Sequence, residues 1–153
     1  MTGLHSPEVI TAAIDHLVST GLFESVQDHE STSASTGGLF ADVWLGPIKP
    51  LPPQSGLAVT SALLTLTVRI YLNAMPPADG SLEQTIGRAA DVLMTAYNAA
   101  FTFDDTVSWV DLLGQYSEGL SGTPGFVTVG GVFYRCITIN VPCVIDDVWP
   151  QSQ

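Results

Sequence analysis

The segment Ser55–Asn73 carries the strongest structural signal in the chain. From Ala62 onward the residues alternate, and a period of two places alternate side chains on opposite faces of a β-strand. The predicted strand is about twice the usual length. One face is apolar and needs a core: Ala62, Leu64, Leu66, Val68, Ile70 and Leu72. The other face is nearly uncharged and suits a covered surface better than open water: Leu63, Thr65, Thr67, Arg69, Tyr71 and Asn73.

The length of 153 residues predicts a single domain over residues 1–153. A compact domain of this size buries roughly 68–70% of its unfolded surface, so stability requires neither a disulfide nor a metal. Charged residues make up 12% of the chain, about half the usual share. Because so few charges do not coat a whole monomer, the remaining apolar and hydroxyl-bearing surface is a candidate for subunit contacts.

The charge balance is strongly acidic, with fifteen acidic residues, four Lys and Arg residues, and a net charge of −11. Nucleic acids and anionic membranes are bound mainly through Lys and Arg. The composition therefore disfavours DNA or RNA binding and disfavours a membrane partner. An acidic surface instead repels the DNA backbone.

The two cysteines, Cys136 and Cys143, are seven residues apart on a predicted strand, with Pro142 between them. They tend to opposite faces, so we expect buried free thiols in a reducing compartment. The N-terminal residues lack the pattern of a signal peptide, and no apolar run approaches the ~20 residues of a membrane span. We expect a protein made in the cytoplasm and used there, or packaged there into something larger.

The first helix is predicted to begin with Ser6 as its N-cap, Pro7 in the first turn and Glu8 as an early acid. Gly21 is placed to end it. The residues between them form one apolar stripe: Ile10, Ala13, Ile14, Leu17 and Val18.

A second helix is predicted after a turn over Met75–Gly80, with Ser81 and Gln84 as a capping box. Gly87 costs about 1 kcal/mol relative to Ala inside this helix, and we expect it to allow close packing on the sheet. The apolar positions follow helical spacing: Leu82, Ile86, Ala89, Leu93, Tyr97 and Ala100.

Two short strands, Phe23–Glu30 and Phe40–Leu45, are predicted to form a hairpin around the low-complexity loop Ser31–Gly38. The following segment, Gly46–Gly56, contains four prolines, so we predict a loop and exclude a helix or a central strand. Its apolar residues indicate that it either packs over its own domain or docks on a neighbour, and both alternatives stay open.

The C-terminal third is predicted to be β-rich, with a Gly130-Gly131 hairpin turn and a bulge near Trp109. The whole chain then reads α, β, β, β, α, β, β, β. This order predicts an α+β fold with one mixed or antiparallel sheet flanked by two helices. The predicted segments are a strand at Val107–Leu113, a loop at Gln115–Gly125, strands at Phe126–Val129 and Val132–Val141, and an extended tail at Cys143–Gln153.

No pattern of residues predicts an enzyme, a cofactor site or a metal site. The histidines are scattered without metal-ligand spacing. Asp104-Asp105 and Asp146-Asp147 are neighbours whose side chains point apart in extended chain, which does not favour acid–base catalysis. Gly119–Gly125 lacks the spacing and the following helix of a nucleophile elbow. We expect solvated acids and solvated or hydrogen-bonded histidines: His5, His16 and His29.

Arg69 and Arg135 are unusual because each lies inside a predicted strand of a chain poor in cations. Each forms an ion pair either within the chain or across a subunit boundary, where Arg is favoured. Among the large aromatic residues, Trp109 is expected in the core. Trp44 and Trp149 fit the core or an interface anchor equally well.

The order of these motifs resembles that of the tail terminator proteins of long-tailed bacteriophages, especially those of actinobacteria. The resemblance spans nearly the whole chain. Its most specific pieces are Ser55–Leu57 with Thr60-Ser61, Val68–Tyr71, Val110–Gly114, Tyr134-Arg135, and the stretch from Pro142 through Asp147-Val148-Trp149. No single piece is diagnostic, and the family has no catalytic motif to carry over.

The resemblance implies a structural virion protein. Such proteins form a homohexameric ring that caps the head-proximal end of the tail tube, stops polymerisation of the tube protein, and presents a surface to head–tail connector proteins. DNA passes through the lumen without specific binding, and acids in the loops are expected to line that lumen. The implied location is the virion tail or neck, assembled in the host cytoplasm.

A ring needs a heterologous interface, in which one patch meets a different patch on the next subunit. The interface candidates are Trp44, Ile48, Leu51, Arg69 and Tyr71. The nearest alternative function is another neck component, such as a connector or stopper. A further alternative is a small-ligand binding module or enzyme, which a deep pocket with convergent polar groups would favour.

Overall fold

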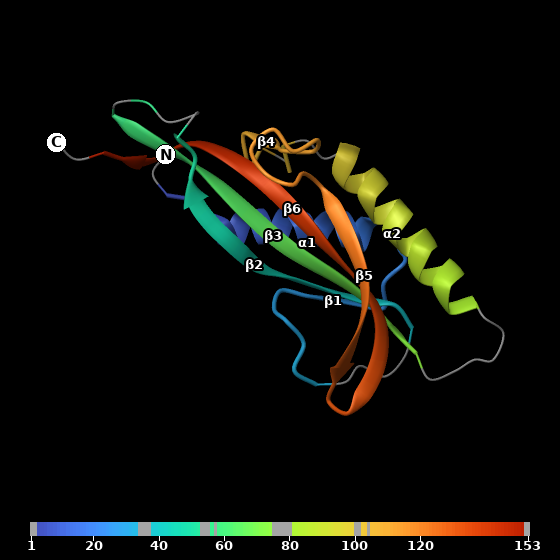
Figure 1. The fold of residues 1–153 in the computed structure, drawn as a ribbon. Coiled ribbons are helices and arrows are strands. Elements are labelled where there is room, and N and C mark those ends of the chain that lie inside the picture. Colours follow the sequence, from blue (N-terminus) through green and yellow to red (C-terminus); the bar gives the residue numbers. More distant parts are fainter. Residues whose placement is uncertain are drawn as a thin grey trace.

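The protein is an α+β fold with one curled sheet and two helices, as the order of elements predicts (Figure 1). The structure, a computed structural model, describes residues 3–33, 38–52, 56, 58–74, 81–99, 102–103 and 105–151. The predicted turn at Met75–Gly80 lies outside the described residues. The elements are α1 (Ser6–Ser19), β1 (Ser25–Gln27), β2 (Phe40–Pro50), β3 (Val59–Asn73), α2 (Ser81–Ala99), β4 (Trp109–Val110), β5 (Ser121–Val129) and β6 (Val132–Pro150).

The sheet is mixed, with strand order β1-β2-β3-β6-β4 and β5 beside β6. Every described pair is antiparallel except β1 and β2, which are parallel, with Ser25 opposite Phe40. The predicted hairpin between the first two strands is therefore wrong, because parallel neighbours need a crossover rather than a tight turn. The long strands β3 and β6 form the centre of the sheet.

Both helices pack on one face of the sheet, and in Figure 1 α1 passes behind the strands. The apolar face of β3 supplies the core as predicted, with Ala62, Leu64, Leu66, Val68 and Ile70 fully buried. The Tyr97 hydroxyl of α2 donates a hydrogen bond to the Ala13 carbonyl of α1, at 3.2 Å. Burial raises the pKa of Tyr97, so this donor keeps its proton. The main helix residues of the core are Val9, Ala13, Leu17, Ile86, Ala89 and Leu93.

The first helix begins one residue away from its predicted cap. His5, not Ser6, is the N-cap, with a left-handed φ of 51° and no side-chain capping bond. Its carbonyl accepts hydrogen bonds from the Glu8 and Val9 amides, which places Ser6 inside the helix. The predicted C-terminus is confirmed, because Gly21 has a φ of 71° and donates its N–H to the Val18 carbonyl.

The second helix spans the predicted residues, but its glycine does not touch the sheet. Gly87 is exposed, and a Cβ added there would meet nothing within 4 Å. The expected close packing at this position is therefore wrong, since the residue faces away from the core. The side chain of Ser81, half of the predicted capping box, lies outside the described part of the structure.

The Pro-rich segment contributes to β2 instead of forming only a loop. β2 continues through Gly46–Pro50, with an irregular register between Leu45 and Ile48 that accommodates Pro47. β1 pairs only with Phe40–Asp42, so the rest of β2 has a free outer edge among the described pairings. Proline is tolerated at such an edge, because its missing N–H faces away from the ladder.

Of the three C-terminal strands, β5 and β6 are longer than predicted and β4 is shorter. β4 contains only Trp109 and Val110, because the chain then turns away from the sheet. β5 begins at Ser121, inside the predicted loop, and β6 continues to Pro150. The Gly130-Gly131 hairpin is confirmed, with φ values of 56° and 81° that suit a tight turn. Cys136 and Cys143 are free and buried, as predicted.

Candidate functional site

The face of β2, β3, β6 and β5 opposite the two helices is the feature most open to a partner, and we call it the helix-free face. Cross-strand register places two polar rows on it. Two hydroxyl-bearing β3 residues, Thr65 and Thr67, are partly exposed there, as the alternation of the sequence predicts. The rows are Trp44, Thr67, Asn140 and Ser121, and next to them Asp42, Arg69, Thr138 and Thr123.

Trp44 and Arg69, two of the interface candidates, lie side by side on the helix-free face. The Arg69 guanidinium carbon is 5.2 Å from the centre of the Trp44 ring, a cation–π arrangement. Arg69 Nε also donates to Thr138 Oγ1 at 3.0 Å. Both residues are only partly buried, so they hold a fixed arrangement while remaining partly open to another molecule.

Tyr71 lies on the same face but is completely buried in the subunit. Its ring stacks on Phe40, with centroids 4.5 Å apart, and meets Tyr134 edge-on. Burial, followed by the neighbouring Asp42 carboxylate, raises the pKa of Tyr71, so its hydroxyl stays neutral. Tyr71 is therefore not a surface contact, and its role as an interface candidate is corrected to that of a small second core.

Leu51 is also buried, at 4% exposure, in a third cluster with Leu63 and Val144. The partly buried Trp109 packs against this cluster, while Trp149 packs against the main core. The Pro-rich segment thus packs over its own domain at Leu51, which removes this residue from the interface candidates.

Ile48 is 41% exposed, but the structure does not bring it together with Trp44 and Arg69. It lies opposite Leu64, whose side chain belongs to the helix-bearing face. Leu45, 42% exposed, is its exposed apolar neighbour on β2. Of the five predicted candidates, two therefore meet on the helix-free face, one lies at the edge of the opposite face, and two are buried.

Asp42 is a buried carboxylate that no sequence pattern singles out. Its exposure is 0%, and Oδ2 accepts a hydrogen bond from the Ser31 amide at 2.8 Å. Asp42 lies directly opposite Arg69 in the β2–β3 register. It therefore fixes the chain after β1 to the sheet, beside the Trp44–Arg69 pair. Its position opposite Arg69 follows from the β2–β3 register, so no local sequence pattern reveals it.

A groove of about 350 Å³ opens on the helix-free face next to the row that contains Trp44, and Asn140 belongs to both. Its floor is formed by β3 and β6, with the end of β2 on one side and the loop after β4 on the other. Charged side chains, Lys49 and Glu118, line these two sides and are exposed. The remaining lining residues are Pro47, Leu63, Thr65, Ser117, Gly119, Asn140 and Pro142.

The loop wall of this groove is held in place by Asp111, another buried carboxylate. Asp111 is 4% exposed and accepts hydrogen bonds from the Gln115 amide, the Tyr116 amide and the Ser117 hydroxyl at 2.7–2.9 Å. Burial raises the pKa of Asp111, but these hydrogen bonds outweigh it and hold the pKa below its usual value. The carboxylate is therefore ionised and organises the loop.

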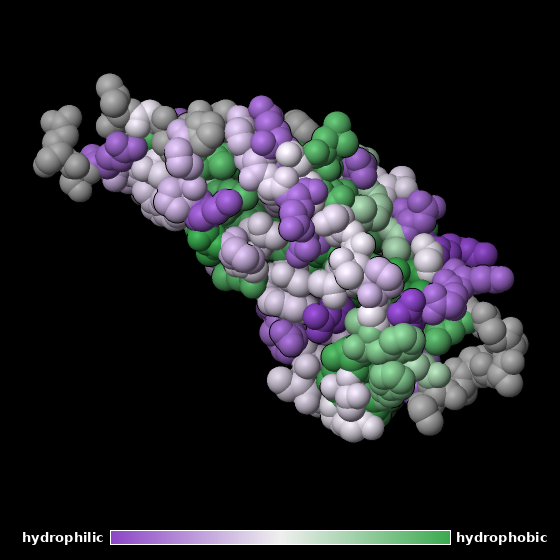
Figure 2. All heavy atoms as spheres, viewed as in Figure 1, coloured by the Kyte–Doolittle hydropathy of each residue, from purple (hydrophilic) through white to green (hydrophobic). Residues whose placement is uncertain are grey.

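Arg135 forms an intrachain ion pair, one of the two predicted alternatives. Its Nε lies 2.8 Å from Glu83 Oε1 of α2, and its guanidinium lies over the Phe126 ring at 4.6 Å. Phe126 in turn stacks on Phe133, with centroids 5.1 Å apart. The two rings are 55% and 42% exposed, so the β5–β6 hairpin presents apolar surface (Figure 2).

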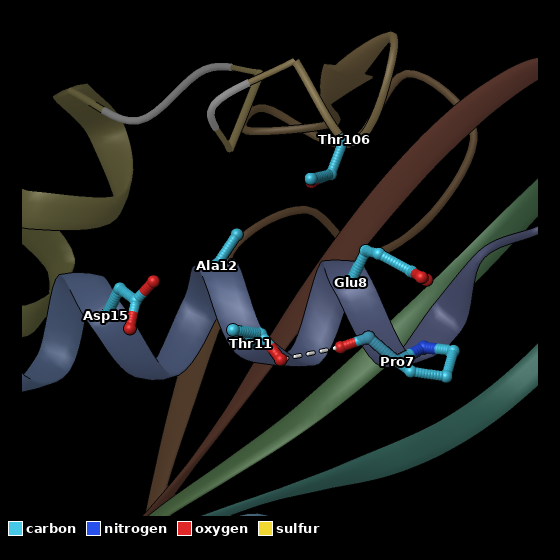
Figure 3. A pocket seen from close by; sticks show the side chains of 6 residues that line it. All are labelled: Pro7, Glu8, Thr11, Ala12, Asp15 and Thr106. Atoms are coloured by element: carbon cyan, nitrogen blue, oxygen red, sulfur yellow. Dashed lines mark hydrogen bonds between the residues drawn. The ribbon is translucent and has the colours of Figure 1, made fainter.

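The acids do not converge on a catalytic arrangement in the described residues. A second hollow lies along α1, where the Glu8 and Asp15 side chains stand two turns apart, with Ala12 and Thr106 between them (Figure 3). Asp146 accepts from the Ser61 hydroxyl at 3.1 Å beside an irregular point in the β3–β6 register. Asp104 lies outside the described residues.

Within the described ranges, no group of three or more His, Cys, Asp or Glu residues is arranged to hold a metal ion. None of the described helices has the length and apolar content to cross a membrane. Comparison with models of known protein families gives no match, and no curated protein matches the chain either.

Proposed function

We propose that this protein is a structural subunit without enzymatic activity or cofactor, and that copies of it assemble into a ring that terminates a bacteriophage tail tube. In this role the ring, a hexamer by resemblance, stops polymerisation of the tube protein at the head-proximal end. It also presents the surface for head–tail joining, and DNA passes through its lumen. The protein would then reside in the tail or neck of the virion after assembly in the host cytoplasm.

The observation that carries the proposal is the helix-free face, where hydroxyl, amide and aromatic groups make up most of the two polar rows, and Asp42 and Arg69 are their charged members. Trp44 and Arg69 lie ordered on this face, with hydroxyl groups around them. Trp and Arg are the residues enriched at the energetic centres of protein interfaces. The acidity of the chain supports the same role, because a conduit for DNA must not bind phosphates.

The test is the addition of the purified protein to tube protein during polymerisation, with tube length measured by electron microscopy. We expect shorter, capped tubes and a ring at one end. Tubes of unchanged length would overturn the termination role. Ends that grow normally but then bind head connectors would instead favour another neck component.

A further inference from the structure

The two most distinctive surfaces of this chain are complementary, and they lie on opposite faces of the same sheet. The first, the hairpin patch, consists of Phe126, Phe133, Arg135 and Glu83. The second is the groove between Lys49 and Glu118 on the helix-free face. We infer that the hairpin patch of one copy docks in the groove of a second copy, which forms a head-to-tail contact.

The hairpin patch is apolar, with an ion pair beside its two aromatic rings. Phe126 pairs in register with Arg135, whose neighbour on α2 is Glu83. The stacked rings of Phe126 and Phe133 are about half exposed on the face of the hairpin. Figure 1 shows the hairpin at one end of the molecule, and Figure 2 shows hydrophobic surface gathered over it. An exposed aromatic pair is a typical anchor for a partner protein.

The groove is concave, and it offers both apolar surface and hydrogen-bonding groups to an aromatic anchor. Its floor includes Leu63 and Pro142, with Pro47 at the edge strand, so aromatic rings meet apolar surface. Asn140 and Thr65 add hydrogen-bonding groups. Its volume of about 350 Å³ matches the lower end of the range for pockets that hold a ligand.

Each of the two surfaces carries one positive and one negative side chain, so opposite charges of two copies can face each other. The hairpin patch carries Arg135 and Glu83, and the groove carries Lys49 and Glu118. Lys49 and Arg135 are two of only four cations in the chain, so half of its positive charges lie at these two surfaces. Opposite charges on facing patches orient two proteins and exclude wrong partners.

A single copy cannot dock its own hairpin patch in its own groove. Phe133 and Pro142 lie nine residues apart on β6, a distance of about 30 Å at the usual rise of a strand. β6 is paired with β3 along this whole stretch, so the hairpin cannot fold back onto its own groove. Because the patch and the groove also face opposite sides of the sheet, a second copy is the occupant that completes both. This inference rests on the proposed function only in that a ring requires such a head-to-tail contact.

Two variants test the contact by native mass spectrometry and sedimentation over a range of protein concentrations. Phe126→Ser/Phe133→Ser removes the anchor, and Asn140→Trp fills the groove. We expect each to raise the concentration at which oligomers form by about tenfold or more. Val18→Ser, at a 60% exposed residue of α1, is the control and should leave association unchanged. Glu118→Arg, an exposed change at the groove rim, repeats the groove test where Asn140→Trp misfolds.

Mixing the two variants gives the decisive result. Each retains one good surface, so a head-to-tail contact predicts dimers of one copy of each variant that grow no further. A mixture that remains monomeric would overturn the inference, as would variants with the wild-type mass profile or a wild type that stays monomeric at its highest soluble concentration. Association through these surfaces without an effect on tube length would leave the inference intact and overturn the termination role alone.

Discussion

Asp111 is the single residue on which the wall of the groove most depends, because three hydrogen bonds converge on its carboxylate. Asp111→Ala leaves those donors without their acceptor, and we expect it to lower the free energy of unfolding by about 1–3 kcal/mol. Urea denaturation followed by circular dichroism measures this loss. Glu118→Ala, at an exposed residue of the same loop, is the control, and an equal loss there would contradict the role of Asp111.

The Asp111 carboxylate should also make the free energy of unfolding depend on pH. The pKa of Asp111 is lower in the folded protein than in the unfolded chain, where it is about 3.9. Its ionised form therefore stabilises the fold in full when the pH is above that unfolded value, and this stabilisation is lost as the pH falls through the folded pKa. The destabilisation caused by Asp111→Ala should therefore be complete at pH 7 and shrink below about pH 4. A difference between wild type and variant that stays constant down to pH 3 would show that the charge plays no part.

Single residues show where sequence reasoning succeeded and where it failed. The alternation along β3 correctly assigned its core face, because a period of two dictates the side on which each residue lies. It did not reveal that Tyr71 and Leu63, on the other side, are buried as well. Phe40 and Tyr134 cover Tyr71, and Leu51 packs against Leu63. Such covering residues come from distant parts of the chain, and no local pattern predicts them.

At the scale of elements, the glycine in α2 offers a stabilising change. Gly87 is exposed in the helix, with open space where a Cβ would lie. Gly87→Ala should raise the free energy of unfolding by about 1 kcal/mol, because alanine has the higher helix propensity. Thermal denaturation measures the gain. Gly46→Ala is the contrast, since its Cβ would lie 2.7 Å from the Thr65 carbonyl oxygen, and this variant should be destabilised.

Trp44, on β2, is the interface candidate that a single substitution tests most directly. Trp44→Ala should leave the subunit folded, because Trp44 is only partly buried, and should weaken assembly by removing the aromatic partner of Arg69. Trp44→Phe keeps an aromatic ring beside the guanidinium and should retain part of the association. Native mass at dilute concentration reads out both variants, and an unchanged oligomer in Trp44→Ala would exclude this residue from the interface.

The elements that the sequence missed share one cause. Gly46–Pro50 and Ser121–Gly125 are rich in proline and glycine, which favour loops, yet both segments are strands. Each pairs on one side only among the described strands, and a sheet edge tolerates residues that lack an N–H or a side chain. Which strands become edges is decided by the tertiary fold, so composition alone misassigns them. The helices, whose periodicity is local, were predicted nearly to the residue.

For the whole molecule, the excess of acids makes a prediction about DNA. Wild type should not bind duplex DNA even at low salt, because its charge repels phosphates. Asp28→Lys/Glu30→Lys, at two exposed acids after β1, should bind measurably at low salt if these acids face the lumen. Fluorescence anisotropy with a labelled duplex measures both, and Asp28→Asn/Glu30→Gln controls for the loss of side-chain contacts. Equal binding by wild type would contradict the proposed conduit.

The pairing of β3 with β6 also sets the order in which the subunit forms. Partners in this ladder are 61 residues apart at Asn73 and Tyr134, and 91 apart at Val59 and Pro150. Such separations make folding slow, since chain entropy must be lost before these contacts form. During synthesis, the edge of β3 that pairs with β6 stays unpaired until β6 has left the ribosome. The subunit thus cannot offer a finished groove to a neighbour until its last strand is in place, which delays assembly until each chain has folded.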